Sequence, residues 1–160
     1  MAGQTNGTNG AAGREQLRQA NAAIRDALDF PEEYLAPAYR HGVALYEHHR
    51  YAEAGEVFQF LAACDCTNPA LWKALGASRK MLGRHEEAVA AFGMAVASGS
   101  TDPWVPVHAA ECLMHLHRYP EAVAALRHAA GAAKLSPEEA PDLGRRLGAL
   151  LQGVERSLAA

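Results

Sequence analysis

Histidine and cysteine side chains offer the sequence's candidates for covalent chemistry. His108 and Cys112 are four residues apart, so on a helix they would share one face and could form a Cys–His nucleophile pair. No third group follows at a spacing that would orient such a histidine, and no glycine-rich phosphate loop or nucleophile elbow is present. We therefore expect no catalytic residues and a protein that is not an enzyme.

The same residue types could bind a metal ion, but their spacing argues against it. Cys64 and Cys66 lack a second pair at a spacing typical of zinc sites. His48 and His49 are adjacent, so on a helix their side chains point about 100° apart. We therefore expect no metal site and no cofactor, with the cysteines serving as small core residues.

A five-residue phrase that recurs every 34 residues identifies the elements that hold these side chains. RYAEA, RHEEA and RYPEA occupy Arg50–Ala54, Arg84–Ala88 and Arg118–Ala122. A fixed period of this length is typical of stacked helical hairpins. Each phrase is predicted to mark the turn from the first helix of a hairpin into the second.

A shift of 34 residues aligns more than this phrase. The aligned positions hold small or large apolar residues in common: Gly42, Gly76 and Ala110; Ala54, Ala88 and Ala122; Phe58, Phe92 and Leu126; Leu61, Ala95 and Ala129. Small residues belong where two helices approach closely, and large ones where a gap must be filled. We predict that the alanine of each phrase packs back onto the glycine of the partner helix.

The sequence divides into four segments. We predict a disordered tail over 1–13, an N-terminal helix over 14–30, three tandem tetratricopeptide-type hairpins over 35–133 and a C-terminal capping helix over 136–158. The hairpins are expected at 35–65, 69–98 and 103–133. The fold class is therefore all-α, a right-handed superhelix with a concave groove.

Several boundaries carry capping signals. Asn68-Pro69 and Asp102-Pro103 each suggest an N-cap followed by proline in the first helical position. Pro106 removes one early backbone donor, so the helix it lies in is expected to start late or to bend. Ser136, followed by proline and two glutamates, predicts the start of the last helix.

Composition excludes several classes of function. The formal net charge is −3, and no cluster of Lys and Arg suggests binding to nucleic acid or to an anionic membrane. No apolar segment approaches the length of a membrane span, and the first residues do not resemble a secretory signal. With three unevenly placed cysteines, we expect a reducing, cytoplasmic location.

Leu71–Val96 carries the Trp, Leu-Gly, Ala, Phe and Ala of a tetratricopeptide repeat, whereas Ala38 and Pro106 replace the Trp in the other copies. The segments ALYEHHRYAEAGEVFQFLAACD, LGASRKMLGRHEEA and DPWVPVHAAECL together resemble the class II chaperones of bacterial type III secretion, the SycD/LcrH, IpgC and PcrH-like proteins. The resemblance covers about 31–133, and His108–Cys112 carries it most closely.

This resemblance implies an ATP-independent bacterial chaperone for hydrophobic translocators, the proteins that later form a pore in a host membrane. Such chaperones bind an extended client segment of the form Pro-x-Leu-x-x-Pro in the concave groove. The resemblance also implies a homodimer through the N-terminal helix and, in some members, an interaction with a transcription regulator.

Helical periodicity predicts which residues line the groove. Tyr39, Val43 and Tyr46 form one stripe of the first hairpin, opposite Gly42. The equivalent stripe holds Lys73, Ala77 and Lys80 in the second hairpin and Val107, Glu111 and Met114 in the third, with Met81 nearby. Tyrosine offers a flat apolar body with a hydroxyl, and methionine adapts to more than one client.

Each of these residues also has a simpler interpretation. Tyr39 and Tyr46 fit a core that packs on the N-terminal helix, Ala77 and Val107 fit either setting, and Lys73 and Lys80 fit a solvated surface. Two other binding functions remain open, a generic scaffold for an amphipathic helix and a clamp for the C-terminal carboxylate of heat-shock chaperones. The clamp needs several converging cations, and the stripes offer only the two lysines.

Overall fold

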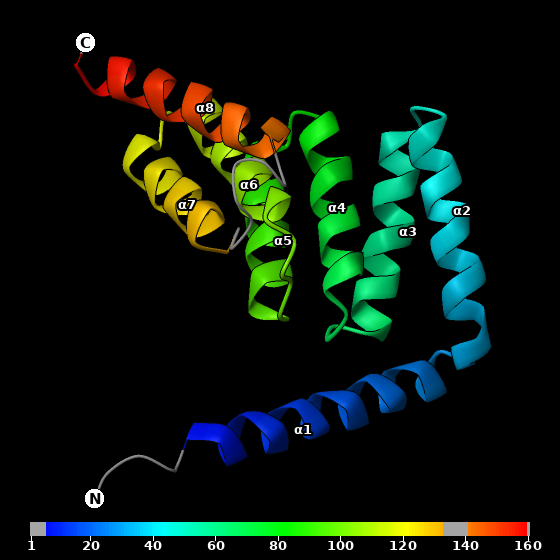
Figure 1. Cartoon of the computed structure of the whole chain (residues 1–160). Coiled ribbons are helices and arrows are strands. Elements are labelled where there is room, and N and C mark those ends of the chain that lie inside the picture. Colours follow the sequence, from blue (N-terminus) through cyan, green and yellow to red (C-terminus); the bar gives the residue numbers. More distant parts are fainter. Residues whose placement is uncertain (1–5, 133–140, 160) are drawn as a thin grey trace, which may run out of the picture.

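The protein folds as three helical hairpins stacked side by side (Figure 1). The structure, a computed structural model, describes residues 6–132 and 141–159. After a short 3₁₀ helix, Glu32–Tyr34, the hairpins are α2 and α3 (Leu35–Glu47, Tyr51–Cys64), α4 and α5 (Pro69–Met81, His85–Ala97), and α6 and α7 (Trp104–His115, Tyr119–Ala132). All regular structure in the described residues is helical, which confirms the predicted all-α repeat fold.

The recurring phrase lies at the turn inside each hairpin, as predicted. The backbone N–H groups of Arg50, Arg84 and Arg118 each donate to a carbonyl five residues earlier, at 2.9 Å. The residue before each arginine has a left-handed backbone: φ is 61° at His49, 72° at Gly83 and 57° at His117. This combination is a Schellman-type helix end, which satisfies carbonyls that the first helix leaves without a partner.

Inside each hairpin, the two helices meet where a large side chain fills the space left by a missing one. A Cβ atom on Gly42 would lie 2.7 Å from Cε1 of Phe58, and one on Gly76 would lie 2.7 Å from Cδ1 of Phe92. The predicted partner, the alanine of the phrase, is not among the nearest atoms at Gly42 or Gly76. The phenylalanine one turn further along the second helix meets the glycine, because only its ring is long enough to fill the gap.

The predicted N-cap residues Asn68 and Asp102 both cap a helix, but the second helix begins one residue later than predicted. Asn68 accepts a hydrogen bond from the Ala70 N–H at 3.0 Å, with Pro69 in the first helical position. Asp102 accepts from the Trp104 N–H at 2.9 Å, but α6 begins at Trp104, after Pro103 rather than at it. Pro106 neither delays α6 nor breaks it, because the first turn of a helix has no partners for its N–H groups. The start predicted at Ser136 lies outside the described residues.

The N-terminal helix α1 is longer than predicted, spanning Asn6–Ala27 instead of 14–30. Most of the predicted tail, residues 6–13, is therefore helical. Adding a residue to an existing helix costs much less free energy than nucleating a new helix. The helical turns after residue 13 can therefore extend toward the N-terminus through the glycines and asparagines of this segment. At the other end, Asp29 adopts a positive φ of 50°, and the helix stops before it.

Polar contacts hold α1 against the end of the first hairpin. Asn21 is buried, and its amide bonds both to Asp65 Oδ1, at 3.3 Å, and to the Cys66 N–H, at 3.4 Å. Arg25 donates to the Cys64 carbonyl at 3.1 Å. Figure 1 shows α1 crossing beneath the hairpins rather than stacking with them.

The last helix, α8 (Pro141–Ala159), lies across α6 and α7 (Figure 1). Its Leu143 and Val154 are almost fully buried against the third hairpin. A capping helix over 136–158 was predicted, and the described part of α8 occupies most of that range. Neither α8 nor any other helix in the described part of the chain is long and apolar enough to cross a membrane.

The contact between Gly76 and Phe92 can be tested with Gly76→Ala and the matched variant Gly93→Ala. The new methyl group of Gly76→Ala overlaps a buried ring, and we expect the free energy of unfolding to fall by about 1–3 kcal/mol. Gly93 lies in α5 with nothing within 4 Å of its added Cβ, so Gly93→Ala should raise stability by about 0.5–1 kcal/mol. Urea unfolding followed by circular dichroism measures both, and equal stability of the two variants would contradict the packing described.

Candidate peptide-binding groove

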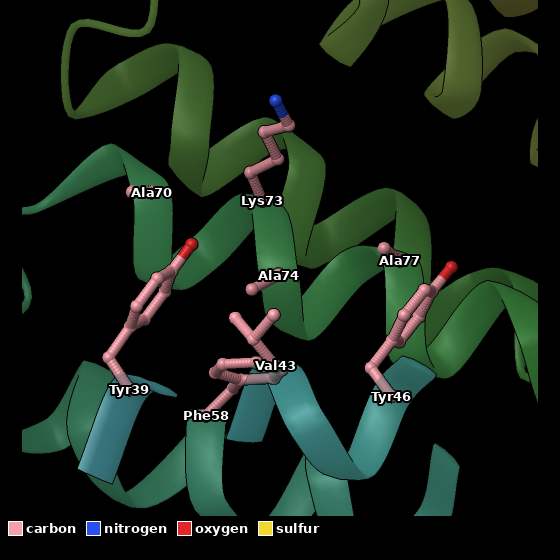
Figure 2. Close-up of a pocket in the computed structure, with 8 residues that line it drawn as sticks. All are labelled: Tyr39, Val43, Tyr46, Phe58, Ala70, Lys73, Ala74 and Ala77. Carbon is pink, nitrogen blue, oxygen red and sulfur yellow. The ribbon is translucent and has the colours of Figure 1, made fainter. Parts of the chain in front are cut away.

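A pocket of about 220 Å³ opens between α2 and α4, with α3 behind it (Figure 2). Its lining is almost entirely uncharged and comprises Tyr39, Val43, Tyr46, Phe58, Ala70, Lys73, Ala74 and Ala77. We call this space the first pocket. The structure thus brings together five of the residues predicted from periodicity, three from the first hairpin and two from the second.

The space exists because the two facing helices carry side chains of unequal size. On α2, Tyr39, Val43 and Tyr46 project into the pocket, and Figure 2 shows the two tyrosine rings on either side of Val43. On α4, the facing residues are chiefly alanines, which are too short to fill the gap. Phe58 is buried with its ring centroid 5.6 Å from that of Tyr39, so the pocket rests on the core of the hairpin.

Three lining residues, Phe58, Ala70 and Ala74, were not predicted. Ala70 and Ala74 lie on either side of Lys73 at helical spacings, so the alanine pattern of α4 was a signal available in the sequence. The repeat alignment predicted Phe58 to be a core residue. Phe58 belongs both to the core and to the pocket wall, because the ring that packs on Gly42 also borders the pocket.

The pocket's polar groups are neutral or already paired. The ring of Tyr46 lies 5.1 Å from that of Tyr51, and burial, together with Tyr51, raises the pKa of the Tyr46 hydroxyl. This hydroxyl therefore stays protonated and can both donate and accept hydrogen bonds. Lys73 forms an ion pair with Asp102, so its aliphatic stem contributes to the wall while its charge is compensated.

The third hairpin does not extend the groove as predicted. Val107 is fully buried against Ala129 and Leu143, so it has no surface to offer a ligand. Met114 Cε lies 3.5 Å from the position of a Cβ on Gly153. Helix α8 packs against this stripe and buries Val107. The repeat period alone could not reveal this, because the resting place of the last helix depends on contacts between segments distant in sequence.

Glu111 is also excluded from the first pocket. It is 9% exposed and lies at the centre of a charged cluster. Arg146 of α8 donates to its Oε1, with Nε at 2.8 Å, and Lys80 of α4 donates to its Oε2. His108 Nδ1 lies 3.2 Å from the same Oε2. Lys80, predicted to meet a client, is therefore bound to Glu111, and these ion pairs connect α4, α6 and α8.

Met81, the remaining predicted residue, ends α4 and does not line the first pocket. Half of its surface is exposed. The predicted set therefore separates into residues of the first pocket, residues near α8 and this one exposed methionine.

The cysteines and histidines show no arrangement for metal binding or nucleophilic attack. Within residues 6–132 and 141–159, no group of three or more His, Cys, Asp or Glu side chains could hold a metal ion. Cys112 is fully buried, and burial raises the pKa of its thiol to about 11. Its thiolate is therefore scarce at neutral pH, and a nucleophilic role with His108 has no chemical support.

Comparisons with known proteins give the same result as the resemblance read from the sequence. No protein-family model matches the chain. The low calcium response locus protein H of Yersinia pseudotuberculosis is 28% identical over 141 residues, 88% of this chain and 83% of that protein. The crystal structure of the type III secretion chaperone SycD of Yersinia enterocolitica with a peptide of the translocator YopD has a TM-score of 0.74 and 26% identity, covering 79% of this chain and 96% of that one. PcrH in complex with the chaperone-binding region of PopD has a TM-score of 0.73 and 28% identity, covering 80% and 96%.

In sequence and fold, the chain is similar to the class II type III secretion chaperones. The similarity covers nearly the whole length of these relatives, so it includes the hairpins and the flanking helices rather than one repeat. In the present chain, the first pocket lies between the first and second hairpins.

The charged cluster around Glu111 makes the stability of the protein depend on pH in a predictable direction. Burial alone would raise the pKa of Glu111, but the hydrogen bonds from His108, Lys80 and Arg146 outweigh burial and hold that pKa well below 4.5. Because the pKa is lower in the folded than in the unfolded chain, the ionised carboxylate stabilises the fold above about pH 4.5, and this contribution is lost as the pH falls.

We therefore expect Glu111→Gln to be less stable than the unmodified protein at pH 7, by about 1–3 kcal/mol, and the difference to shrink between pH 5 and pH 2. Urea unfolding at a series of pH values measures it. Glu155→Gln, which changes an exposed acid on α8, is the control and should keep the wild-type profile. A constant difference across the pH range would show that Glu111 does not act through its charge.

Proposed function

We propose that this protein is a cytoplasmic bacterial chaperone that binds hydrophobic translocators through an extended segment held in the first pocket. The observation that carries the proposal is the pocket's uncharged, mostly apolar lining, provided by Tyr39, Val43 and Tyr46 on one side and alanines on the other. SycD and PcrH, with which the chain shares its fold, are described in complexes with translocator segments.

The chemistry of the pocket suits a client that must be held and later released. Burying one client leucine would contribute roughly 1.5–3 kcal/mol, and the tyrosine hydroxyls can bond to the client backbone. No buried charge has to be stripped of water, because Lys73 is already paired with Asp102. Binding of this kind masks apolar segments that would otherwise associate before export. It needs neither a cofactor nor catalysis.

The clamp for acidic heat-shock C-termini receives no support from this geometry. Such a clamp requires free cations that converge on a carboxylate. In the first pocket the one cation is Lys73, which Asp102 neutralises. An extended apolar segment therefore fits the first pocket better than a terminal carboxylate.

Tyr39 and Tyr46 can be tested together by Tyr39→Ala/Tyr46→Ala in co-expression with candidate translocators. Losing both rings removes the apolar walls, and we expect affinity for the translocator to fall about tenfold to a hundredfold, so that less of it stays soluble and co-purifies. Tyr34→Ala is the matched control, since Tyr34 is exposed and outside the pocket. Circular dichroism checks that all variants remain helical. Undiminished capture by the double variant would rule out the first pocket as the site.

We further propose that α1 forms a homodimer. Leu17, Ile24 and Leu28 are 41–52% exposed. Their spacing of seven and four residues places them on one face, next to Asn21 and Arg25, which hold the helix to its own chain, so the partly exposed apolar side chains border the contact with the first hairpin. An exposed apolar stripe of this length is suited to burial against a second copy.

The dimer can be tested with Leu17→Glu/Ile24→Glu, which places two charges on this stripe. We expect the variant to be a monomer in size-exclusion chromatography with light scattering at concentrations where the unmodified protein is a dimer. Glu15→Gln/Gln19→Glu, which alters exposed polar positions on α1, should leave the mass unchanged. A dimeric Leu17→Glu/Ile24→Glu variant would place the interface elsewhere.

A further inference from the structure

A second hollow, of about 430 Å³, lies beside α8. Residues from α4, α6, α7 and α8 line it: Lys80, Glu111, Met114, His115, Tyr119, Arg146, Leu150 and Ser157. Ala77, in the first pocket, and Lys80, in the second hollow, are one turn apart on the same stripe of α4. A segment that leaves the first pocket along α4 would therefore reach the second hollow.

The second hollow combines an apolar wall with an excess of positive charge. Met114, Tyr119 and Leu150 supply apolar surface. Lys80 and Arg146 carry two positive charges, and Glu111 compensates one of them. Among the described residues that line the hollow, Glu111 is the one acid. A net charge of about +1 therefore remains beside a largely apolar surface.

The two cations keep donors for a further ligand. An ammonium group has three N–H donors and a guanidinium has five, so binding to one carboxylate does not exhaust either. The side chain of Arg146 is 51% exposed, so its unused donors can be reached from solvent. Both cations are paired with Glu111, so they lie close to each other in the hollow.

Two stacked histidines border the same region. The rings of His85 and His115 are parallel within 5°, with centroids 4.5 Å apart. His85 Nδ1 is buried and has no hydrogen-bond partner. Burial, with His115 and Lys80 nearby, lowers the pKa of His85, so His85 adds no charge to the second hollow at neutral pH. The positive charge there therefore comes from Lys80 and Arg146.

We propose that the second hollow binds a client side-chain carboxylate that lies next to a bulky apolar side chain. The carboxylate meets Lys80 and Arg146, and the apolar neighbour rests on Met114 and Leu150. This inference rests on the proposed function, because it assigns the second hollow to a further part of the same client. A neutral side chain in place of the acid would lose the ion pair, and a basic one would be repelled.

The probe is the capped dipeptide N-acetyl-leucyl-glutamate amide, which has one carboxylate beside one leucine, and its neutral match is N-acetyl-leucyl-glutamine amide. Two-dimensional NMR of the 15N-labelled full chain follows binding at millimolar concentrations. We expect the acidic probe to shift amides around Met114, His115 and Leu150 and to bind at least about fivefold more tightly than the neutral one, with the difference shrinking in high salt.

Two variants should change this binding in opposite directions. Arg146→Gln removes one cation and should weaken the acidic probe about fivefold or more, whereas Arg156→Gln, an equal change of charge on α8 outside the hollow, should not. Glu111→Gln removes the competing acid and should tighten binding about threefold to tenfold. Thermal unfolding of each variant confirms that α8 remains folded at the temperature of the titration.

Equal binding of the two probes, no binding of either, or no response to Arg146→Gln in a folded variant would overturn the proposal. These outcomes are separate from those of the translocator test. If the dipeptide fails but capture still depends on Tyr39 and Tyr46, the first pocket stands and the second hollow does not. If capture fails while the dipeptide binds, the second hollow serves a different ligand from the one proposed for the first pocket.

Discussion

The contact of a phenylalanine ring with a glycine sets the geometry on which the groove depends. Phe58 on Gly42 and Phe92 on Gly76 fix how closely the two helices of each hairpin approach. The outward stripe of α2 then faces α4 of the next hairpin across a gap. The first pocket is the part of this gap that α4 leaves open by carrying alanines. The packing of the hairpin core and the shape of the first pocket therefore depend on each other, since Phe58 takes part in both.

The ion pairs of the protein leave the first pocket without net charge and hold α8 on the stack of hairpins. Lys73 is paired with Asp102 outside the apolar lining. Lys80 and Arg146 are paired with Glu111, which ties α8 to the second and third hairpins. A buried carboxylate with partners from two other helices is costly to disrupt, so this cluster holds the capping helix in one orientation. The first pocket, in contrast, contains no ion pair that a client would have to break.

Sequence reasoning was accurate where a local, repeated pattern determines the structure and inaccurate where contacts between distant segments do. The 34-residue period located the hairpins, the turns at Arg50, Arg84 and Arg118, and the stripe formed by Tyr39, Val43 and Tyr46. It assigned Val107 to the groove because that residue is in phase with Tyr39. The period carries no information about α8, whose leucines bury Val107 completely. Similarly, composition predicted a tail before residue 14, although the helix reaches Asn6.

The position of α8 has a consequence for how many segments one copy can accommodate. Repeat arrays of this kind usually present an extended concave surface, along which a chain can lie. Here the protein's own last helix packs along part of the third hairpin and leaves the second hollow beside it. An extended guest in the first pocket can continue along α4 to the second hollow, where α8 forms one wall. One copy therefore offers a single continuous surface, from the first pocket to that wall, for one extended stretch of a client.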